Sequence, residues 1–223
     1  MNTILNEQIK KFYESSATLE TRMKDLAKYF LYGGYINVRN QYHIYIKTVE
    51  FYYHEEDGDI KDPIMYHRNN YFVEGDIPYF TPLSFNSHDT GVDISFENEK
   101  KKIRASVLIR AYEVLDCNNG RLVWNPTAGQ FQKYVEGEAK NIYNTQCLYL
   151  KRILNGFTSE GTPEITWIDD DSFNLEDIHD KDVTTICRKG VFESENDERY
   201  MPIKGKKNNR KWGFRREKDI VLR

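Results

Sequence analysis

The sequence predicts an α+β protein, in which a curved, mostly antiparallel sheet packs against helices from the N-terminal part of the chain. Two observations support this prediction. Apolar residues recur every three or four positions across residues 19–32, which is the spacing of an amphipathic helix. Further along, residues 91–96 and 103–114 have the pattern of two strands, and the charged turn 97–102 joins them as a hairpin.

The helical N-terminal segment covers about residues 3–32 and divides into two helices. The first is expected over residues 3–14 and the second over residues 19–32. The apolar stripe of the second helix consists of Leu19, Met23, Leu26, Ala27 and Phe30. Thr18 can cap the start of this helix, and Gly33-Gly34 ends it.

The rest of the chain alternates between strand patterns and turns. Residues 43–53 have a period of two and are expected to form a strand, which a polar loop over residues 55–74 follows. Asn118-Asn119-Gly120 is a turn signal, and residues 138–154 are expected to form a helix packed on the sheet. Short strands are expected near 164–168, 183–188 and 211–216.

The length and composition indicate one globular unit. Of the 223 residues, 39% are hydrophobic and 30% charged, with no internal repeat or long linker, so residues 1–223 are expected to form a single domain. No apolar run approaches the roughly 18 residues of a membrane span, and the first residues lack the apolar stretch of a signal peptide. We therefore expect a cytoplasmic monomer without a membrane partner.

The cysteines and histidines give little support to a metal centre. The 3 cysteines are far apart and form no C-x-x-C pair, which argues against a disulfide framework and against a thiolate zinc site. We expect neither a metal nor a cofactor. A metal-assisted hydrolase that uses His67, His88 and Asp89 stays open as an alternative.

The charges are distributed unevenly, although the formal net charge is only −3. Residues 158–182 are acidic, whereas the C-terminal strand region of about 204–218 is basic. Basic side chains can neutralise phosphates, which makes this region a candidate DNA contact. The side chains expected to make that contact are Lys206, Lys207, Arg210 and Lys211. The alternative interpretation is an ordinary solvated surface.

Three residues are candidates for chemistry. Glu50 lies among aromatic residues of its strand, and a carboxylate desolvated by such neighbours suits proton transfer. Arg110 shares a strand face with Leu108 and Arg104, so a carboxylate or phosphate partner is expected for it. His67 lies in a loop that a proline stiffens. Each also has a structural interpretation: an outward-facing strand residue, a salt bridge or a surface histidine.

Several segments, taken in order, resemble the alkyladenine (3-methyladenine) DNA glycosylase family. Residues 107–113, V-L-I-R-A-Y-E, are similar to the family's V-L-L-R-A-x-E, and residues 48–52, T-V-E-F-Y, are similar to its T-E-A-Y strand. Residues 25–33 resemble its opening helix with the glycine that follows. Residues 188–191, R-K-G-V, resemble its R-x-G-V.

The resemblance implies a role for each matching position. Glu50 would be the general base that activates water, and Arg110 would help to hold that water. Tyr52 would stack on the extruded base in a slot that holds a single flipped-out purine, and His67 would form a hydrogen bond in the same slot. Asp93 would also contact the base, at a position where the family has asparagine.

The implied function is a monofunctional glycosylase that removes damaged, alkylated purines from double-stranded DNA after flipping them out of the helix. Tyr79, Phe80 and Phe85 are the candidates for the aromatic residue that fills the gap in the duplex. Asp93 departs from the family, because an ionised carboxylate only accepts hydrogen bonds and repels phosphates. The alternative is therefore a non-catalytic protein of the same fold that binds nucleic acid, a free purine or a nucleotide.

Overall fold

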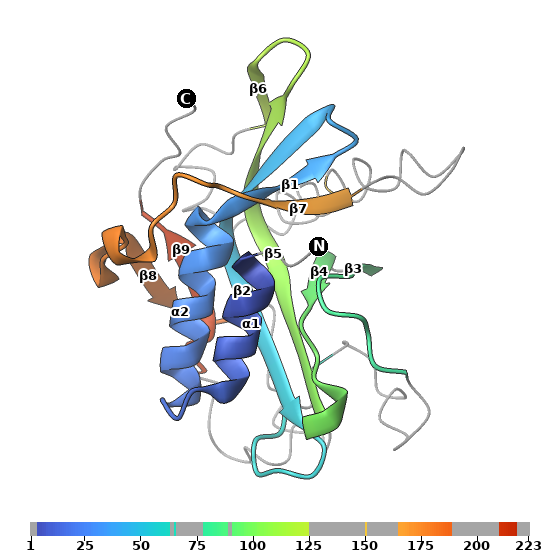
Figure 1. The fold of residues 1–223 in the computed structure, drawn as a ribbon, viewed down its shortest axis with the longest axis vertical. Coiled ribbons are helices and arrows are strands. Elements are labelled where there is room, and N and C mark those ends of the chain that lie inside the picture. Colours follow the sequence, from blue (N-terminus) through green and yellow to red (C-terminus); the bar gives the residue numbers. More distant parts are fainter. Residues whose placement is uncertain are drawn as a thin grey trace.

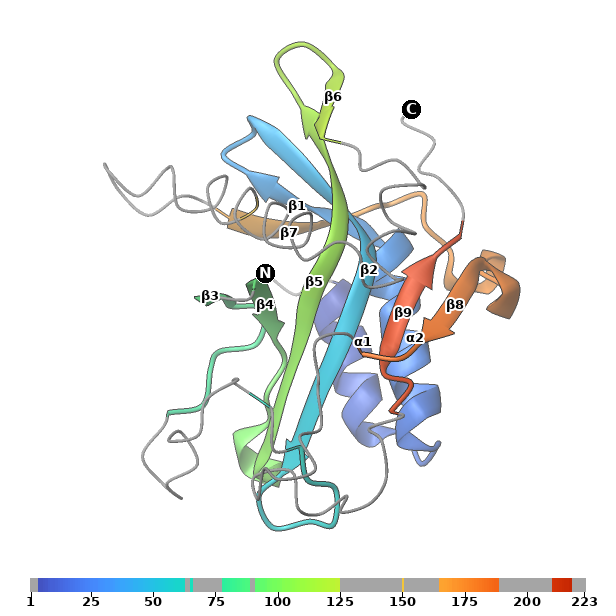
Figure 2. The ribbon, with the colours of Figure 1, turned by 180° about the vertical axis from the view of Figure 1, so that it is seen from behind.

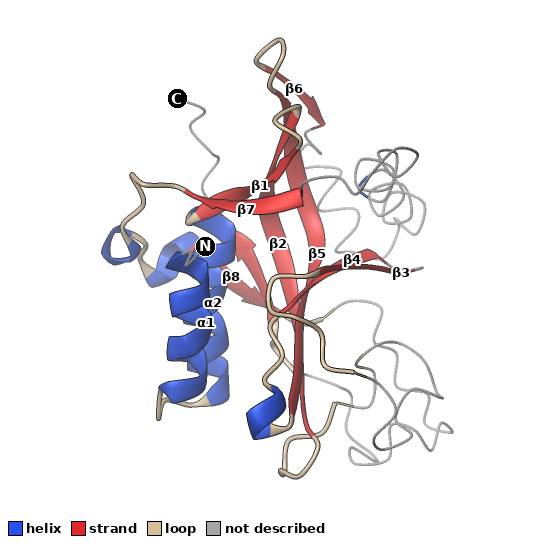
Figure 3. Ribbon diagram, turned by 45° about the vertical axis from the view of Figure 1, so that its right-hand side comes forward, coloured by secondary structure: helices blue, strands red, loops and turns tan. Residues whose placement is uncertain are grey.

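The computed structural model describes residues 4–62, 65, 78–88, 91–124, 150, 165–188 and 210–217. Two helices pack side by side against one face of a curled antiparallel sheet (Figure 1). Turning the molecule by 45° separates the helices from the strands as two layers (Figure 3). The predicted α+β class with a mostly antiparallel sheet is confirmed.

The helices begin and end close to where the sequence predicts. α1 spans Ile4–Glu14 and α2 spans Leu19–Tyr32, and the Thr18 hydroxyl accepts a hydrogen bond from the Thr21 N–H at 3.3 Å. Gly33 follows α2 with φ of −84°, so its role is not a left-handed turn. A Cβ there would lie 2.8 Å from the Tyr29 ring, and this close approach explains the glycine.

The Thr18 cap supports a first prediction. Thr18→Ala removes the acceptor for a free N–H of the first turn of α2, so we expect the free energy of unfolding to fall by about 1 kcal/mol. Urea unfolding measures this difference. Thr18→Ser is the matched control, because it keeps the hydroxyl and should stay close to the wild type. Equal losses in both variants would show that the hydroxyl is not the stabilising group.

The start of α1 is capped from a distant strand. The Asp169 carboxylate accepts hydrogen bonds from the Ile4 N–H at 2.7 Å and from the Leu5 N–H at 3.3 Å. The Trp167 indole donates to the same carboxylate at 2.9 Å. A carboxylate at a helix N-terminus also interacts favourably with the helix dipole, so Asp169 ties α1 to the sheet.

The sheet has nine strands in the described residues, and two long strands dominate it (Figure 2). Strand bounds are β1 Gly34–Val38, β2 Tyr42–Glu55, β3 Phe85–His88, β4 Gly91–Ser95, β5 Ile103–Asp116, β6 Arg121–Trp124, β7 Ile165–Asp169, β8 Val183–Ile186 and β9 Gly213–Arg216. The main order is β3-β4-β5-β2-β1-β7. In addition, β6 pairs with β5, and β9 pairs with both β2 and β8.

Most of the predicted strands and turns are found. β4 and β5 form the expected hairpin, whose turn contains a short 3₁₀ helix, Glu99–Lys101, and a left-handed Lys102. Gly120, with φ of 65°, ends the turn before β6. Strands β1, β3 and β6 were not predicted from the sequence. The predicted helix 138–154 lies outside the described residues except for Leu150, which is helical and buried.

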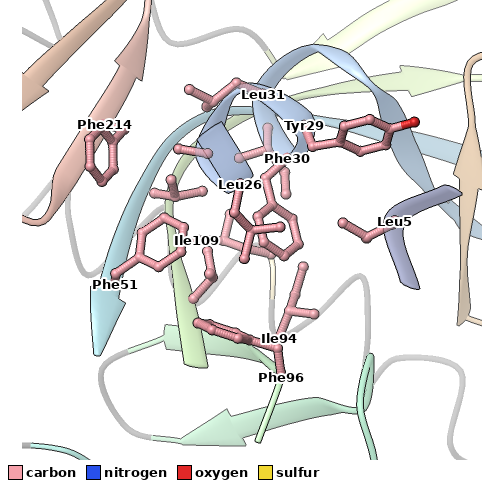
Figure 4. Packing of buried hydrophobic residues seen from close by; sticks show 14 of the residues in the cluster. Leu5, Leu26, Tyr29, Phe30, Leu31, Phe51, Ile94, Phe96, Ile109 and Phe214 are labelled. Atoms are coloured by element: carbon pink, nitrogen blue, oxygen red, sulfur yellow. The ribbon is translucent and has the colours of Figure 1, made fainter. Parts of the chain in front are cut away.

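The main hydrophobic core lies between the two helices and the sheet (Figure 4). Aromatic rings connect the layers: Phe51 of β2 makes edge-on contacts with Phe30 of α2 and with Phe214 of β9, at ring-centroid distances of 6.4 and 5.5 Å. Leu5, Leu26 and their neighbours on both helices fill the space around these rings. Among the described residues, no helix has the length and apolar character needed to cross a bilayer.

Candidate functional site

An irregularity in β2 and β5 decides which side chains face the candidate site. Ile44 and Ile46 of β2 belong to the core, and simple alternation would place Glu50 beside them. The pairing of β2 with β5 shifts register on both sides of Thr48, so Val49 and Phe51 enter the core instead. Glu50 and Tyr52 therefore lie on the opposite face of the sheet. Such bulges often occur next to active sites, where they redirect side chains.

Strand register brings a row of residues together on this second face. Glu50 pairs with Leu108 of β5, and Leu108 pairs in turn with Asp93 of β4. Directly paired residues of neighbouring strands point to the same face, so the two carboxyl groups flank Leu108. Arg110 follows Leu108 by two residues and shares that face. All four side chains are buried.

Glu50, Arg110 and Tyr52 form a compact triangle. The Arg110 Nη2 atom lies 2.5 Å from the Glu50 Oε2 atom, with side-chain exposures of only 3% and 1%. The same Nη2 donates to the Tyr52 hydroxyl at 3.2 Å, and that hydroxyl donates to Glu50 Oε2 at 3.3 Å. Burial raises the pKa of Tyr52 far above its ordinary value, although the nearby Arg110 cation offsets part of the rise. Tyr52 is therefore a neutral phenol that can donate to the carboxylate.

A second arginine lies against the ring of Tyr52. The Arg188 Cζ atom is 4.8 Å from the centroid of the Tyr52 ring and 5.0 Å from that of Trp212. Asp62, which is fully buried, accepts from Arg188 Nη1 at 2.5 Å and from Nη2 at 3.3 Å. Burial lowers the pKa of Arg188, but the Asp62 carboxylate more than offsets this and leaves the pKa above its ordinary value. Arg188 is thus a permanent cation beside Tyr52.

Asp93 lies on the same face of the sheet as Glu50, and Leu108 lies between the two. Its Oδ2 atom accepts a hydrogen bond from the Ser106 hydroxyl at 3.3 Å, and only 5% of the residue is exposed. Ser106 pairs with Tyr52, so this contact links the Asp93 position to the triangle. Asp93 adds an acceptor group at the β4 end of the row.

Of the other residues predicted to contact the base or fill the duplex, His67 lies outside the described residues. The Tyr79 ring stacks against Arg104, whose Cζ is 3.6 Å from the ring centroid, and this contact holds Tyr79 on the protein. The Phe80 N–H donates to Glu97 at 2.7 Å. Phe85 begins β3 and packs against the edge of the core. Phe80 is half-buried.

The predicted phosphate contacts are only partly described. Lys206 and Lys207 lie outside the described residues, whereas Lys211 is exposed. Arg210 makes internal contacts: its Nη2 donates to the Lys61 carbonyl at 2.7 Å, and its guanidinium stacks on Trp212 at 4.5 Å. Arg210 therefore holds the approach to β9 against the loop after β2.

Asp62, Arg188 and Trp212 were not predicted from the sequence as members of this site. The only signal for Arg188 was its place in the R-K-G-V segment, and Asp62 had none. As for metals, His67 and Asp89 are not described. The described residues contain no group of three histidine, cysteine or carboxylate side chains that could bind a metal ion.

Comparison with known proteins finds no relative of this chain. No protein-family model matches the chain, and no curated protein or solved structure matches it. The arrangement of Glu50, Tyr52 and Arg110 is therefore the basis on which a function is proposed.

Proposed function

We propose that the protein is a DNA glycosylase-like hydrolase that removes a damaged purine base. The observation that carries this proposal is the buried triangle of Glu50, Arg110 and Tyr52, in which a carboxylate, a cation and an aromatic ring meet within hydrogen-bonding distance. These are the groups needed to activate a water molecule beside a stacked base.

The chemistry follows from the charges of these groups. The Arg110 cation lies 2.5 Å from Glu50, and a carboxylate can act as a general base that accepts a proton from water. The water oxygen forms a bond to the sugar carbon, while the bond from that carbon to the purine nitrogen breaks and its electron pair leaves with the base. Arg110 and the Tyr52 hydroxyl hold the carboxylate in place, and the Tyr52 ring offers a stacking surface.

Access to this site requires a movement. The Glu50 side chain is 1% exposed, so a purine reaches it only after neighbouring side chains shift. A base-flipping enzyme couples such a shift to insertion of the extruded nucleotide. The binding energy of the duplex would then drive the opening of the slot.

The test uses duplexes that each contain one defined damaged purine, with alkali-labile abasic sites as the readout. Wild-type protein should release the base, and Glu50→Gln should lower the rate by about 100- to 10,000-fold while duplex binding is retained. Glu14→Gln is the control, since Glu14 is 61% exposed on α1, and it should keep the wild-type rate. Undiminished release by Glu50→Gln would remove Glu50 from the mechanism.

Asp93 favours a second candidate function, a non-catalytic protein that binds nucleic acid, a free purine or a nucleotide through the same slot. Its buried carboxylate adds negative charge to a site that would approach a phosphate backbone. This function predicts binding of damaged duplex or free purine without base release. Glu50→Gln should then leave the measured affinity unchanged, and any turnover by the wild type would exclude it.

A further inference from the structure

A cavity of about 540 Å³ lies in the helical layer, whereas Glu50 lies on the opposite face of the sheet. Its walls come from α1, from α2 and from a short 3₁₀ helix, Leu175–Asp177. Pockets that hold small organic ligands typically have volumes of about 300–1,000 Å³. The cavity is therefore large enough for such a ligand, and the chemistry proposed for Glu50 makes no use of it.

An arginine with an unusual environment forms part of the cavity wall. Arg22 of α2 is half-buried, and its Nη1 atom donates to the Phe12 carbonyl at 2.9 Å. The Arg22 Cζ atom lies 4.9 Å from the centroid of the Phe12 ring. Its Nε–H is buried and has no hydrogen-bond acceptor among the residues that the structure describes. Because a guanidinium stays charged at any ordinary pH, a half-buried arginine is expected to have a counter-charge.

The carboxylates that the structure describes form no ion pair with Arg22. Two acidic residues line the same cavity, but both face lysines instead. Asp25 lies 3.7 Å from the Lys28 ammonium, and Glu14 lies 3.9 Å from that of Lys10. The protein therefore does not neutralise Arg22 by a direct pair in the described part of the chain.

Tyr53 is close to Arg22 but supplies no charge to it. Burial raises the pKa of Tyr53 to about 12, and Glu55 adds to this rise, whereas the Arg22 cation opposes part of it. The phenol is thus uncharged at neutral pH, and its hydroxyl donates to Glu55 at 3.0 Å. A backbone carbonyl, an aromatic ring and a neutral phenol surround Arg22, and such an environment favours an anionic ligand.

Part of the cavity lining is apolar. Phe12 and Leu26 are only 3% and 2% exposed, and the half-buried Leu175 adds a third apolar side chain. Lys11, an exposed residue in the last turn of α1, supplies a second cation at the wall. A ligand that fits these groups has one negatively charged end and an apolar body.

We propose that this cavity is a binding site for a small organic monocarboxylate with an aliphatic chain. The carboxylate binds Arg22, whose planar fork matches its two oxygens, and the chain lies against Phe12, Leu26 and Leu175. Each methylene group that leaves water adds to the affinity. Asp25 on the same wall repels a doubly charged phosphate ester more strongly than a singly charged carboxylate, so the single charge is favoured.

The experiment titrates the full-length protein with octanoate by isothermal titration calorimetry at about pH 8. We expect octanoate to bind at a single site. Octanol has the chain without the charge and should bind about 10- to 100-fold more weakly. Acetate has the charge without the chain and should bind at least about tenfold more weakly. Octyl phosphate is a dianion at this pH and should also bind more weakly than octanoate.

Three variants assign the binding to this cavity. Arg22→Gln removes the charge and should weaken octanoate binding by about 10- to 100-fold. Lys24→Gln is the matched control on the same helix, because Lys24 is outside the cavity lining and faces Asp180 at 3.1 Å, and it should keep the wild-type affinity. Gln8→Trp places a large ring in the cavity from the half-buried position of Gln8 on α1, and it should block binding with Arg22 in place. Urea unfolding establishes that each variant is folded.

Several results would overturn this site. Equal affinities for octanoate and octanol would exclude a charged ligand, and tighter binding of octyl phosphate would exclude the monocarboxylate class. Unchanged binding by folded Arg22→Gln, or by Gln8→Trp should the first variant not fold, would place the octanoate elsewhere. Wild-type protein that does not bind octanoate at all would contradict the proposal outright. None of these measurements depends on whether the protein releases a damaged base.

Discussion

Replacing Arg110 with methionine is expected to lower the free energy of unfolding by about 3–5 kcal/mol. The Arg110 and Glu50 side chains are 3% and 1% exposed, and their charged atoms lie 2.5 Å apart. Removing the cation leaves the carboxylate in a buried environment without its partner, and the desolvation penalty of that charge then acts on the folded state alone. Urea unfolding of both proteins measures the difference.

Two controls identify the buried charge as the cause. Glu50→Gln/Arg110→Met removes both charges and should recover a large part of the loss, because no ionised group is left alone. Lys10→Met breaks the ion pair between Lys10 and Glu14, whose side chains are 74% and 61% exposed. This variant should change the free energy of unfolding by less than about 0.5 kcal/mol. A loss below about 1 kcal/mol for Arg110→Met would mean that water reaches Glu50.

Features with local causes could be read directly from the sequence. The bounds of α2, its Thr18 cap and the β4–β5 hairpin all follow from residues close together in the chain, and all three are found. β1, by contrast, has only five residues, and just two of them, Ile36 and Val38, are apolar residues of the core. So short a segment gives no distinct periodic signal.

The orientation of Glu50 could not be predicted, because it depends on the irregular register around Thr48. Alternation from Ile44 and Ile46 puts Glu50 in phase with the core, and the register shift reverses that phase. The insertion is visible only when β2 is paired with β5. The resemblance to the glycosylase family pointed to Glu50, Tyr52 and Arg110 through short motifs, without any information on this bulge.

The second ion pair of the site was beyond prediction for a different reason. Asp62 and Arg188 are 126 residues apart in the chain, and neither lies in a periodic pattern that marks it as buried. Pairing of two charges carries no local sequence signature, so only the packing of the loop after β2 against the residues that follow β8 brings them together. The ring of Trp212 beside Arg188 depends on the same packing.

Glu97 is the group from which we expect the largest pH dependence of stability. It follows β4, its side chain is fully buried, and burial raises its pKa to about 7. The Phe80 N–H at 2.7 Å and the Arg104 guanidinium at 3.2 Å oppose this rise, whereas the nearby Glu56 carboxylate adds to it. Its Oε1 atom is buried and has no hydrogen-bond partner among the described residues, which agrees with a poorly solvated carboxylate.

The sign of the effect follows from proton binding. Between the ordinary pKa of a glutamate and about 7, the folded protein binds a proton at Glu97 more tightly than the unfolded chain does. Stability from this group is therefore present at low pH and is lost as the pH rises through this window. One pKa unit corresponds to about 1.4 kcal/mol, so the loss between about pH 5 and 8 is roughly 2–3 kcal/mol.

Glu97→Gln is the variant that isolates this group, since glutamine keeps the size and the acceptor oxygen but does not titrate. Burial lowers the pKa values of His43 and His54, so these histidines act in the opposite direction over part of the same range. The informative quantity is thus the difference between the two proteins, measured by urea unfolding at each pH. Between about pH 5 and 8, we expect the free energy of unfolding of the variant to rise by roughly 2–3 kcal/mol relative to that of the wild type. Parallel stability curves would show that Glu97 is ionised throughout, with Arg104 as a sufficient partner.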